Sequence, residues 1–154
     1  MAIMPLSIRR ATPADAATVT EFNRLLALET EHKTLDLKVL RPGVEAALAD
    51  PTRAWYFLCE DQGNIVGQTM LTFEWSDWRN GWIWWIQSVY VRSDARRGGV
   101  FRLLFEHIRT LATQTPGVVG IRLYVEDNNQ RAHETYYRMG MKRAGYFVLE
   151  QIPL

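Results

Sequence analysis

The feature that most constrains the fold of this chain is an apolar run near its middle. Trp82-Ile83-Trp84-Trp85-Ile86 places apolar side chains on both alternating faces of a strand. A strand of this kind is covered on both sides in the folded protein. The run continues as strand to Val91, and a helical apolar pattern follows from Val100 to Thr113. Strand and helix signals in this order predict an α/β fold.

Period-two and period-3.6 patterns predict the remaining elements. A first helix should start at Thr12-Pro13-Ala14-Asp15, where a capping residue precedes a proline and an acid. We expect Arg41-Pro42-Gly43 to break the chain and a short helix from Val44 to end at Asp50-Pro51. The predicted strands span about 6–9, 54–59, 65–75, 82–91, 121–125 and 145–152, and the predicted helices about 13–31, 44–50, 100–113 and 130–139.

Composition excludes several classes of protein. The chain has 154 residues, with 18 Lys and Arg against 17 Asp and Glu, so one domain without a concentrated basic face for nucleic acid is expected. Cys59 is the one cysteine, which excludes a disulfide scaffold and gives no zinc spacing. No apolar run reaches the roughly 18 residues of a membrane helix, and MAIMPLSIRR lacks the order of a signal peptide. We therefore expect a cytoplasmic protein with no membrane partner.

The junction between strand and helix after Val91 has the chemistry of an anion site. Arg96-Arg97-Gly98-Gly99 precedes the helix that starts at Val100. Glycines allow backbone N–H groups to converge, and a helix N-terminus carries partial positive charge suited to phosphate. A solvated turn is the alternative interpretation of the same residues. The P-loop and Rossmann spacings are both missing.

Two segments resemble the GNAT superfamily of N-acetyltransferases. Val89-Tyr90-Val91 followed by Arg96-Arg97-Gly98-Gly99-Val100 is similar to the family's acetyl-CoA motif, a strand and then Gln/Arg-x-x-Gly-x-Gly/Ala opening a helix. Asn129-Gln130-Arg131-Ala132, with Tyr136 and Gly140-Met141 after it, is similar to the carboxy-terminal motif. The predicted order of elements is also the family's order. The resemblance therefore covers essentially the whole chain and implies a single GNAT acetyltransferase domain over residues 1–154.

The resemblance implies an architecture and a cosubstrate. The fold would be α/β, a mixed and mostly antiparallel sheet of about six to seven strands, with parallel fourth and fifth strands that splay apart, flanked by about four helices. The pantetheine arm of acetyl-CoA would lie in the splay like an extra strand, and no metal is expected. The implied acetyl-CoA-binding residues are Val89, Tyr90, Val91, Arg96, Arg97, Gly98, Gly99, Val100, Phe101, Asn129, Ala132 and Tyr136.

Phe101 departs from the family pattern. The last position of the acetyl-CoA motif is usually Gly or Ala, which permits close approach of the backbone to pyrophosphate. Phe101 also belongs to the apolar stripe of its helix. Its side chain can therefore point into the core while its backbone N–H still faces the phosphates.

The resemblance also implies an acid for the reaction. Tyr136 occupies the family's tyrosine position, where a phenol with a pKa near ~10 can protonate the departing coenzyme A thiolate. Packing on the helix face shared with Ala132 is the alternative role for Tyr136. Asn129 would bind the pantetheine arm or brace the splayed strand, and its alternative role is a helix cap.

The base is less clearly marked in the sequence. Some family members carry a Glu on the fourth strand, whereas this chain has Gln87-Ser88 there. Glu29 and Glu31 end the first predicted helix, a region that borders the acceptor pocket in the family, and their alternative role is surface charge. Gln87 could instead hold a water through which the proton leaves. The three histidines, at positions 32, 107 and 133, are expected to be structural or surface residues.

The tryptophans allow two interpretations. A two-faced core strand accounts for most of them, whereas Trp75 and Trp78 border a predicted loop and could contact the acceptor or a partner subunit. The chain is thus expected to be an acyltransferase that moves acetyl from acetyl-CoA to a primary amine of a small molecule or peptide, with a homodimer as one allowed assembly. The alternative is a non-catalytic GNAT-like module that binds acyl-CoA or a metabolite as a regulatory signal.

Overall fold

A computed structural model describes residues 5–154 and divides them into two compact units. The first unit covers residues 5–123 and the second covers residues 124–154. Each unit is described by itself. The interpretation that the first residues lack a signal peptide rests partly on residues 1–4, which lie outside the described residues.

The first unit is built on one five-stranded sheet in the order β1-β2-β3-β4-β5. Its first four strands pair antiparallel, and β4 pairs parallel with β5, so the predicted mixed sheet is confirmed. The strands are β1 (Ser7–Arg10), β2 (Trp55–Asp61), β3 (Asn64–Ser76), β4 (Gly81–Val91) and β5 (Val118–Leu123). The fifth strand begins and ends earlier than the predicted span 121–125, because Tyr124 and Val125 fall outside it.

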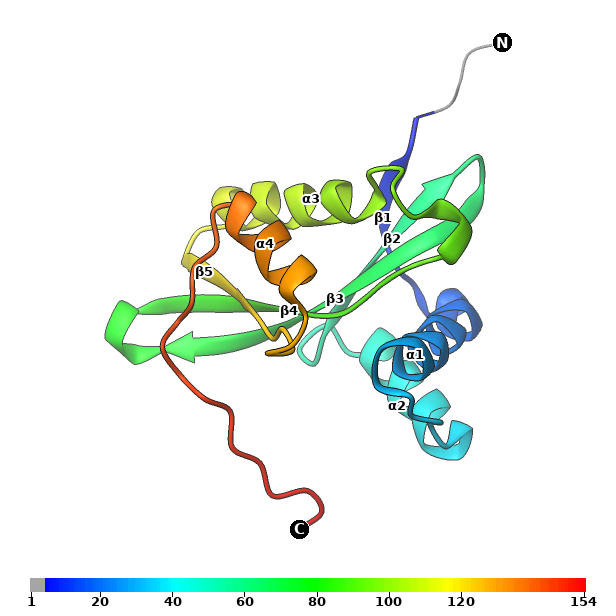
Figure 1. The fold of residues 1–154 in the computed structure, drawn as a ribbon, viewed down its shortest axis with the longest axis horizontal. Coiled ribbons are helices and arrows are strands. Elements are labelled where there is room, and N and C mark those ends of the chain that lie inside the picture. Colours follow the sequence, from blue (N-terminus) through cyan, green and yellow to red (C-terminus); the bar gives the residue numbers. More distant parts are fainter. Residues whose placement is uncertain (1–4) are drawn as a thin grey trace. The chain divides into compact units, whose positions relative to one another are not determined.

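Helices cover both faces of this sheet. The helix α3 (Val100–Gln114) lies on one side, and α1 (Ala16–Glu31) and α2 (Leu37–Ala49) lie on the other (Figure 1). Short 3-10 turns at Pro13–Asp15, Asp77–Arg79 and Ser93–Ala95 connect the elements. The apolar run in β4 requires this arrangement, since Ile83 and Trp84 are each 3% exposed although they point to opposite faces.

Two apolar layers form the core of the first unit. On one face, α1 and α2 pack Val19 and Val44 against Tyr56 and Leu58 of β2. On the other face, α3 buries the stripe that its sequence predicts, which consists of Val100, Leu104, Phe105, Ile108 and Ala112. Gly67 of β3 allows α3 to start close to the sheet, because a Cβ there would lie 2.6 Å from Cγ1 of Val100. The start of α3 is therefore fixed against β3.

The predicted chain break at Arg41-Pro42-Gly43 is wrong. The helix α2 begins at Leu37 and contains Pro42 in its interior. Asp36 caps it by accepting a hydrogen bond from the Lys38 backbone N–H at 2.9 Å. Leu40 and Leu48 pack against the core cluster on the same face as Val44. Tertiary burial of this stripe and the Asp36 cap together outweigh the cost of the proline.

The second unit contains α4 (Gln130–Arg138), close to the predicted helix. The predicted strand over 145–152 is wrong, because no strand is assigned from residue 141 to residue 154. Phe147 and Leu149 are 88% and 92% exposed there. A strand needs a neighbouring strand to share its hydrogen bonds, which an alternating pattern alone does not supply. The sheet therefore has fewer strands than the six to seven expected.

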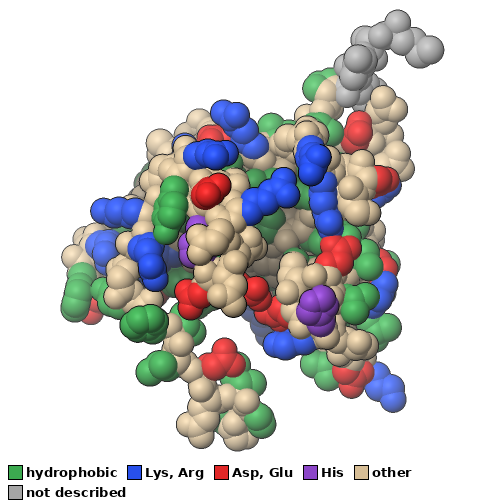
Figure 2. Space-filling view, in the orientation of Figure 1, with side chains coloured by type: hydrophobic (Ala, Val, Ile, Leu, Met, Phe, Trp, Pro, Cys, Tyr) green, Lys and Arg blue, Asp and Glu red, His purple; other side chains and the backbone are tan. Residues whose placement is uncertain are grey.

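The surface carries charges of both signs. On the face shown in Figure 2, Lys and Arg side chains alternate with Asp and Glu side chains. Among residues 5–154, no helix is both long and apolar enough to cross a membrane. The described part of the chain also holds no group of three or more His, Cys, Asp or Glu side chains suited to a metal ion.

Candidate functional site

The sheet of the first unit is interrupted by a bulge in β4. Gln68 of β3 pairs with Tyr90, and Met70 pairs with Gln87, so the two residues Ser88 and Val89 stand opposite Thr69 alone. Ser88 takes a left-handed conformation with φ 51°. A left-handed φ in a non-glycine residue is uncommon, and a bulge bends and twists its strand. β4 therefore changes direction at Ser88.

The bulge coincides with the end of β4–β5 pairing. The parallel pairs run from Trp82↔Val118 to Ile86↔Leu123, and the described pairs go no further. We call residues 81–86 the paired segment of β4 and residues 87–91 its splayed segment. The splayed segment keeps its antiparallel partner β3 through Tyr90 and Val91. Its other edge is therefore available to a ligand that can pair with a strand.

Side chains of β3 hold the peptide groups of the bulge. The Gln68 Nε2 donates to the Ser88 carbonyl at 3.1 Å, and the Thr69 hydroxyl donates to the Gln87 carbonyl at 3.3 Å. Adjacent side chains of a strand point to opposite faces, so the two carbonyls are held from opposite sides of the sheet. The Gln87 side chain is also fixed, since its Nε2 donates to the Thr72 hydroxyl at 2.5 Å.

The loop after β4 has the geometry of an anion site. Gly99 is the N-terminal cap of α3, with φ 83°, and no side chain caps this helix end. A Cβ on Gly99 would project into open space. Arg97 is also left-handed, with φ 68°, and is exposed. The first backbone N–H groups of α3 thus lie beside an open approach, which suits a phosphate, and exposed Arg97 adds positive charge to the same loop.

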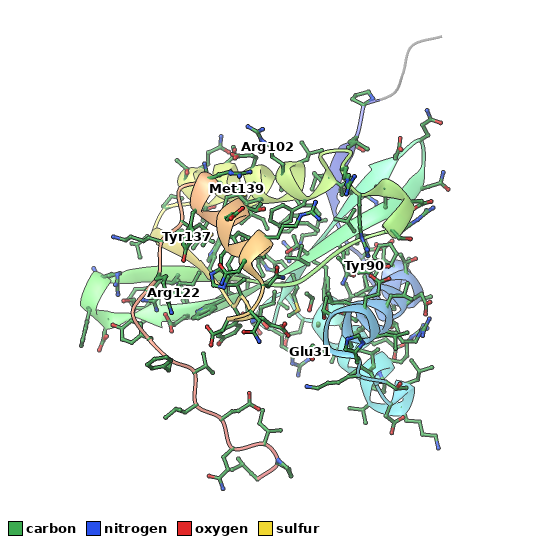
Figure 3. All side chains as sticks on the ribbon, viewed as in Figure 1. Glu31, Tyr90, Arg102, Arg122, Tyr137 and Met139 are labelled. Atoms are coloured by element: carbon green, nitrogen blue, oxygen red, sulfur yellow. The ribbon has the colours of Figure 1, made fainter. Side chains whose placement is uncertain are left out.

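Arg96 connects this loop to α1. Its Nε donates to the Val91 carbonyl at 3.0 Å, and its Nη2 forms an ion pair with the Glu29 carboxylate. The Tyr90 hydroxyl donates to the other Glu29 oxygen at 3.2 Å. Burial and the Glu29 carboxylate raise the pKa of Tyr90. Figure 3 shows the Tyr90 side chain beside α1, so this cluster joins α1, the splayed segment and the loop.

Comparisons with known proteins show which family has this sequence and fold. The model of the GNAT acetyltransferase family matches residues 20–141. The chain belongs to the GNAT family. A solved structure of a possible acetyltransferase from Clostridium difficile 630 is 42% identical, with a TM-score of 0.91, and the match covers 98% of this chain and 99% of that one. None of the curated proteins matches the sequence.

Two further solved structures share the GNAT fold at low identity. An aminoglycoside acetyltransferase from an uncultured soil metagenomic sample, in complex with sisomicin, is 15% identical with a TM-score of 0.79 over 97% of this chain and 96% of that one. A ribosomal-protein-alanine N-acetyltransferase from Brucella melitensis biovar Abortus 2308 is 18% identical with a TM-score of 0.74 over 96% and 99%. The GNAT assignment makes this protein an acyltransferase of a family that uses acetyl-CoA.

Phe101 of this GNAT protein points inward. Its side chain is half-buried and lines one small apolar cavity with Val89 and Ile86 of β4, and its ring centroid is 6.3 Å from that of Phe105. The bulky residue at the last motif position therefore faces the space between α3 and the sheet. Its backbone remains in the first turn of α3, where small residues are usual in the family.

The two glutamates considered as bases differ in their contacts. Both Glu29 oxygens are engaged, one by Arg96 and one by Tyr90. Glu31 is more exposed, and its carboxylate lies 3.3 Å from Nζ of Lys33. Figure 3 places Glu31 at the end of α1. The structure therefore brings Glu29, and not Glu31, into contact with the splayed segment and the loop.

The other predicted site residues lie in the second unit. The Asn129 side chain caps α4 by accepting from the Ala132 backbone N–H at 3.1 Å, which is the capping role considered in its sequence. Burial raises the pKa of Tyr136, so its phenol is protonated at neutral pH. His133 contacts the Glu126 carbonyl at 2.9 Å. Both hydrogen bonds lie within α4 and the loop that precedes it.

The remaining histidines and the tryptophans lie in the first unit. His32 ends α1 in a left-handed conformation, and His107 packs against Phe57 with ring centroids 5.1 Å apart. Burial lowers the pKa of His107. Trp78 is 86% exposed, and half-exposed Trp75 packs against Trp82 across the hairpin.

Sequence reasoning missed the polar residues behind the bulge. Gln68, Asn23 and Tyr56 are all buried and hydrogen-bonded to one another in sequence-distant pairs. The available signal was a pair of adjacent polar residues, Gln68-Thr69, in the predicted strand 65–75, where strict alternation would place at most one of them on the polar face. A buried polar side chain needs a partner, so such a pair could have marked a bulge.

Proposed function

We propose that this GNAT protein transfers the acetyl group of acetyl-CoA directly to a primary amine of a small molecule or peptide, within a ternary complex. The observation that carries the proposal is the splay of β4 from β5 at a bulge, followed at once by an uncapped helix start. The free edge of the splayed segment can form backbone hydrogen bonds with the extended pantetheine arm of acetyl-CoA. The start of α3 offers partial positive charge to its phosphates.

The proposed position of acetyl-CoA follows from this arrangement. The pantetheine arm would pair with the backbone of Val89, Tyr90 and Val91 along the splayed segment. The pyrophosphate would lie at the N–H groups of Gly98, Gly99, Val100 and Phe101, with exposed Arg97, which forms no ion pair within the described residues, as the arginine that adds charge. Arg96 would act on the loop, since its guanidinium already binds Glu29 and the Val91 carbonyl.

The chemistry requires two proton transfers. The amine nitrogen attacks the thioester carbonyl carbon, the carbonyl oxygen becomes an oxyanion near the Val89 N–H, and the C–S bond then breaks. From the carboxy-terminal motif we propose Tyr136 as the acid that protonates the departing thiolate, with Asn129 and Ala132 belonging to the same motif. Burial raises the pKa of Tyr136, so the phenol is protonated at neutral pH and has a proton to give when the thiolate develops.

We propose that the amine loses its proton to water, or that it arrives neutral because the cleft lowers its pKa. An ammonium with a pKa near ~10.4 must lose a proton before attack. Both Glu29 oxygens are engaged, by Arg96 and by Tyr90, and the Gln87 side chain is an amide, which is too weak a base to take the proton itself. A water molecule could carry the proton from the ammonium to Glu29 or Glu31. Desolvation in the cleft could instead lower the pKa of the amine, so that it arrives neutral. If Glu29 or Glu31 takes the proton through water, Glu29→Gln or Glu31→Gln should lower kcat/KM and displace the acidic limb of its pH profile. If water and desolvation suffice, that limb should follow the pKa of the amine, and both variants should behave like the wild type.

The acceptor is proposed at the level of a primary amine. The GNAT neighbours named above act on, or are solved with, an aminoglycoside and a ribosomal-protein alanine, so the shared fold does not select among amines. Trp75 and Trp78 on the β3–β4 hairpin remain candidates for contact with an acceptor or a partner subunit, and their exposure supports contact with something outside the first unit.

The deciding experiment measures free thiol released from acetyl-CoA across a panel of polyamines, amino acids, aminoglycosides and peptide N-termini. We expect at least one amine to give stoichiometric coenzyme A and acetylated amine. Acetyl-CoA should also raise the melting temperature, whereas acetate should not. Unchanged melting at millimolar acetyl-CoA would contradict the proposal. Tyr136→Phe should slow turnover by about 10²-fold with little change in acetyl-CoA binding, and wild-type turnover would return Tyr136 to a packing role.

A further inference from the structure

The peptide group between Ser88 and Val89 is held from behind by one side chain. The Gln68 Nε2 donates to the Ser88 carbonyl at 3.1 Å, and Gln68 is completely buried. Ser88 is left-handed, so its carbonyl is turned out of the regular ladder and toward Gln68. A conformation of this kind persists only where its surroundings hold it.

The orientation of the Gln68 amide is set by a second contact. Its Nε2 lies 3.4 Å from Oδ1 of Asn23 on α1, in addition to the Ser88 carbonyl. Both neighbours are acceptors, so a flipped amide would place Oε1 against two oxygens. The Gln68 Nε2 therefore points at the bulge and its Oε1 points away.

Asn23 is fixed in turn by α1 and β2. Its Nδ2 donates to the Val19 carbonyl at 3.1 Å and to the Tyr56 hydroxyl at 3.2 Å, and Asn23 and Tyr56 are both buried. Burial raises the pKa of Tyr56, whose hydroxyl also hydrogen-bonds the Ser88 side chain. A continuous buried network thus runs from α1 through β2 and β3 to the bulge in β4.

This network determines where the Val89 N–H points. In a trans peptide the C=O and the N–H point in opposite directions. Because Gln68 binds the Ser88 carbonyl, the N–H of Val89 is directed away from Gln68. Val89 belongs to the splayed segment, beyond the last β4–β5 pair. The direction of one catalytic N–H is thereby set by a side chain on the other strand.

We propose that Gln68 is a positioning residue for acetyl transfer: by holding the Ser88 carbonyl, it aims the Val89 N–H at the thioester carbonyl oxygen, with Asn23 and Tyr56 holding Gln68. The inference rests on the proposed function. The Val89 N–H would contact the acetyl carbonyl oxygen in bound acetyl-CoA and more strongly in the oxyanion, so Gln68 acts on the preference for acetyl-CoA over coenzyme A and, to a larger extent, on kcat.

The test compares acetyl-CoA with coenzyme A, which lacks the acetyl oxygen. Gln68→Met keeps the length of the side chain and removes the donor. We expect kcat to fall about 10-fold to 100-fold, as for a displaced oxyanion donor. Calorimetry should show that the preference for acetyl-CoA over coenzyme A also falls, while the affinity for coenzyme A stays at its wild-type value. General loss of stability would not change that preference.

Two further variants keep the test decisive. Thr20→Val is the matched control, since Thr20 is buried on the same helix one turn before Asn23, and its hydroxyl has no hydrogen-bond partner among the described residues. It should keep the wild-type kcat and preference. Tyr56→Phe keeps the ring and loosens Asn23, so it should change both quantities in the same direction as Gln68→Met but less, including where Gln68→Met does not fold.

The outcomes separate this inference from the proposed function. Wild-type protein that neither binds nor turns over acetyl-CoA overturns the proposed function and this inference together. Active wild-type protein whose Gln68→Met and Tyr56→Phe variants keep kcat and the preference overturns the role of Gln68 alone. A fall in kcat with an unchanged preference also overturns it, because the Val89 N–H would then keep its direction.

Discussion

The paired and splayed segments of β4 lie in one strand and have opposite properties. The paired segment contains no ionisable side chain, and Ile83, Trp84 and Ile86 are buried in it. In the splayed segment, the carbonyls of Gln87, Ser88 and Val91 accept hydrogen bonds from side chains. The contrast indicates that the sheet is stabilised where β5 pairs with β4 and is shaped by side chains where it does not.

The largest expected effect breaks the paired segment. Trp84→Ala should lower the free energy of unfolding by about 3–5 kcal/mol, because the Trp84 ring is buried against Trp55 and Phe73. Urea denaturation measures this loss. Trp82→Ala is the control in the same segment, and its half-exposed ring should cost about 1 kcal/mol through its contact with Trp75. Equal losses would mean that the segment is not a core strand.

The next effect concerns the loop that follows the splayed segment. Gly99→Val should raise the Kd for acetyl-CoA by about 10-fold or more, because the side chain would occupy the open approach to the start of α3. Gly117→Val is a matched control, since Gly117 has the same φ of 83° and the same open surroundings but precedes β5. Both variants carry the same backbone strain. Calorimetry with equal Kd values for the two would remove Gly99 from the cosubstrate site.

A smaller effect is expected at the link between the loop and α1. Arg96→Ala should raise the KM for acetyl-CoA about 5-fold, because the Val91 carbonyl and Glu29 lose their shared partner. The free energy of unfolding should change by less than about 1 kcal/mol, as for exposed ion pairs. Arg41→Ala, which removes the exposed pair with Glu45, should leave KM at the wild-type value. A KM change in both variants would point to a nonspecific charge effect.

The smallest expected effect is a pH dependence of stability that comes from Tyr90 in the splayed segment. Burial, followed by the Glu29 carboxylate, raises the pKa of Tyr90 in the folded protein. Its contribution to stability is complete below the unfolded pKa of about 10 and is lost as pH rises through the folded value. The free energy of unfolding, measured from pH 8 to pH 11, should therefore decline less steeply in Tyr90→Phe than in the wild type. Parallel curves would contradict the shift.

Local patterns predicted much of the fold and part of the site. The apolar stripe of α3, the glycine before it and the inward side chain of Phe101 could be predicted because each depends on neighbours within a few residues. The α/β class and the parallel pair β4–β5 are confirmed. The start of α2 was missed because the helix depends on packing against β2, which outweighs Pro42.

The polar network behind the bulge could not be predicted in the same way. Gln68 lies 45 residues from Asn23 and 20 residues from Ser88 along the chain, and the hydrogen bonds exist only once α1, β3 and β4 are packed. The left-handed Ser88 has no sequence signal, since serine is not a residue that favours this conformation. The proposed roles of Tyr136, Asn129, Glu29 and Glu31 stay predictions that the kinetic experiments address.

The single thiol of the protein offers a way to observe it at work. Cys59 is fully buried in β2 between β1 and β3, and burial with its acidic neighbours raises its pKa to about 11. At neutral pH the native protein should thus not react with a thiol reagent, so the colour in a thiol-release assay comes from coenzyme A alone. Without substrate, the slow rate at which a thiol reagent labels Cys59 measures how often β2 opens away from β1 and β3. If acetyl-CoA slows this labelling, the bound cosubstrate makes local opening of the sheet at β2 rarer, although β2 is not one of the strands proposed to bind it.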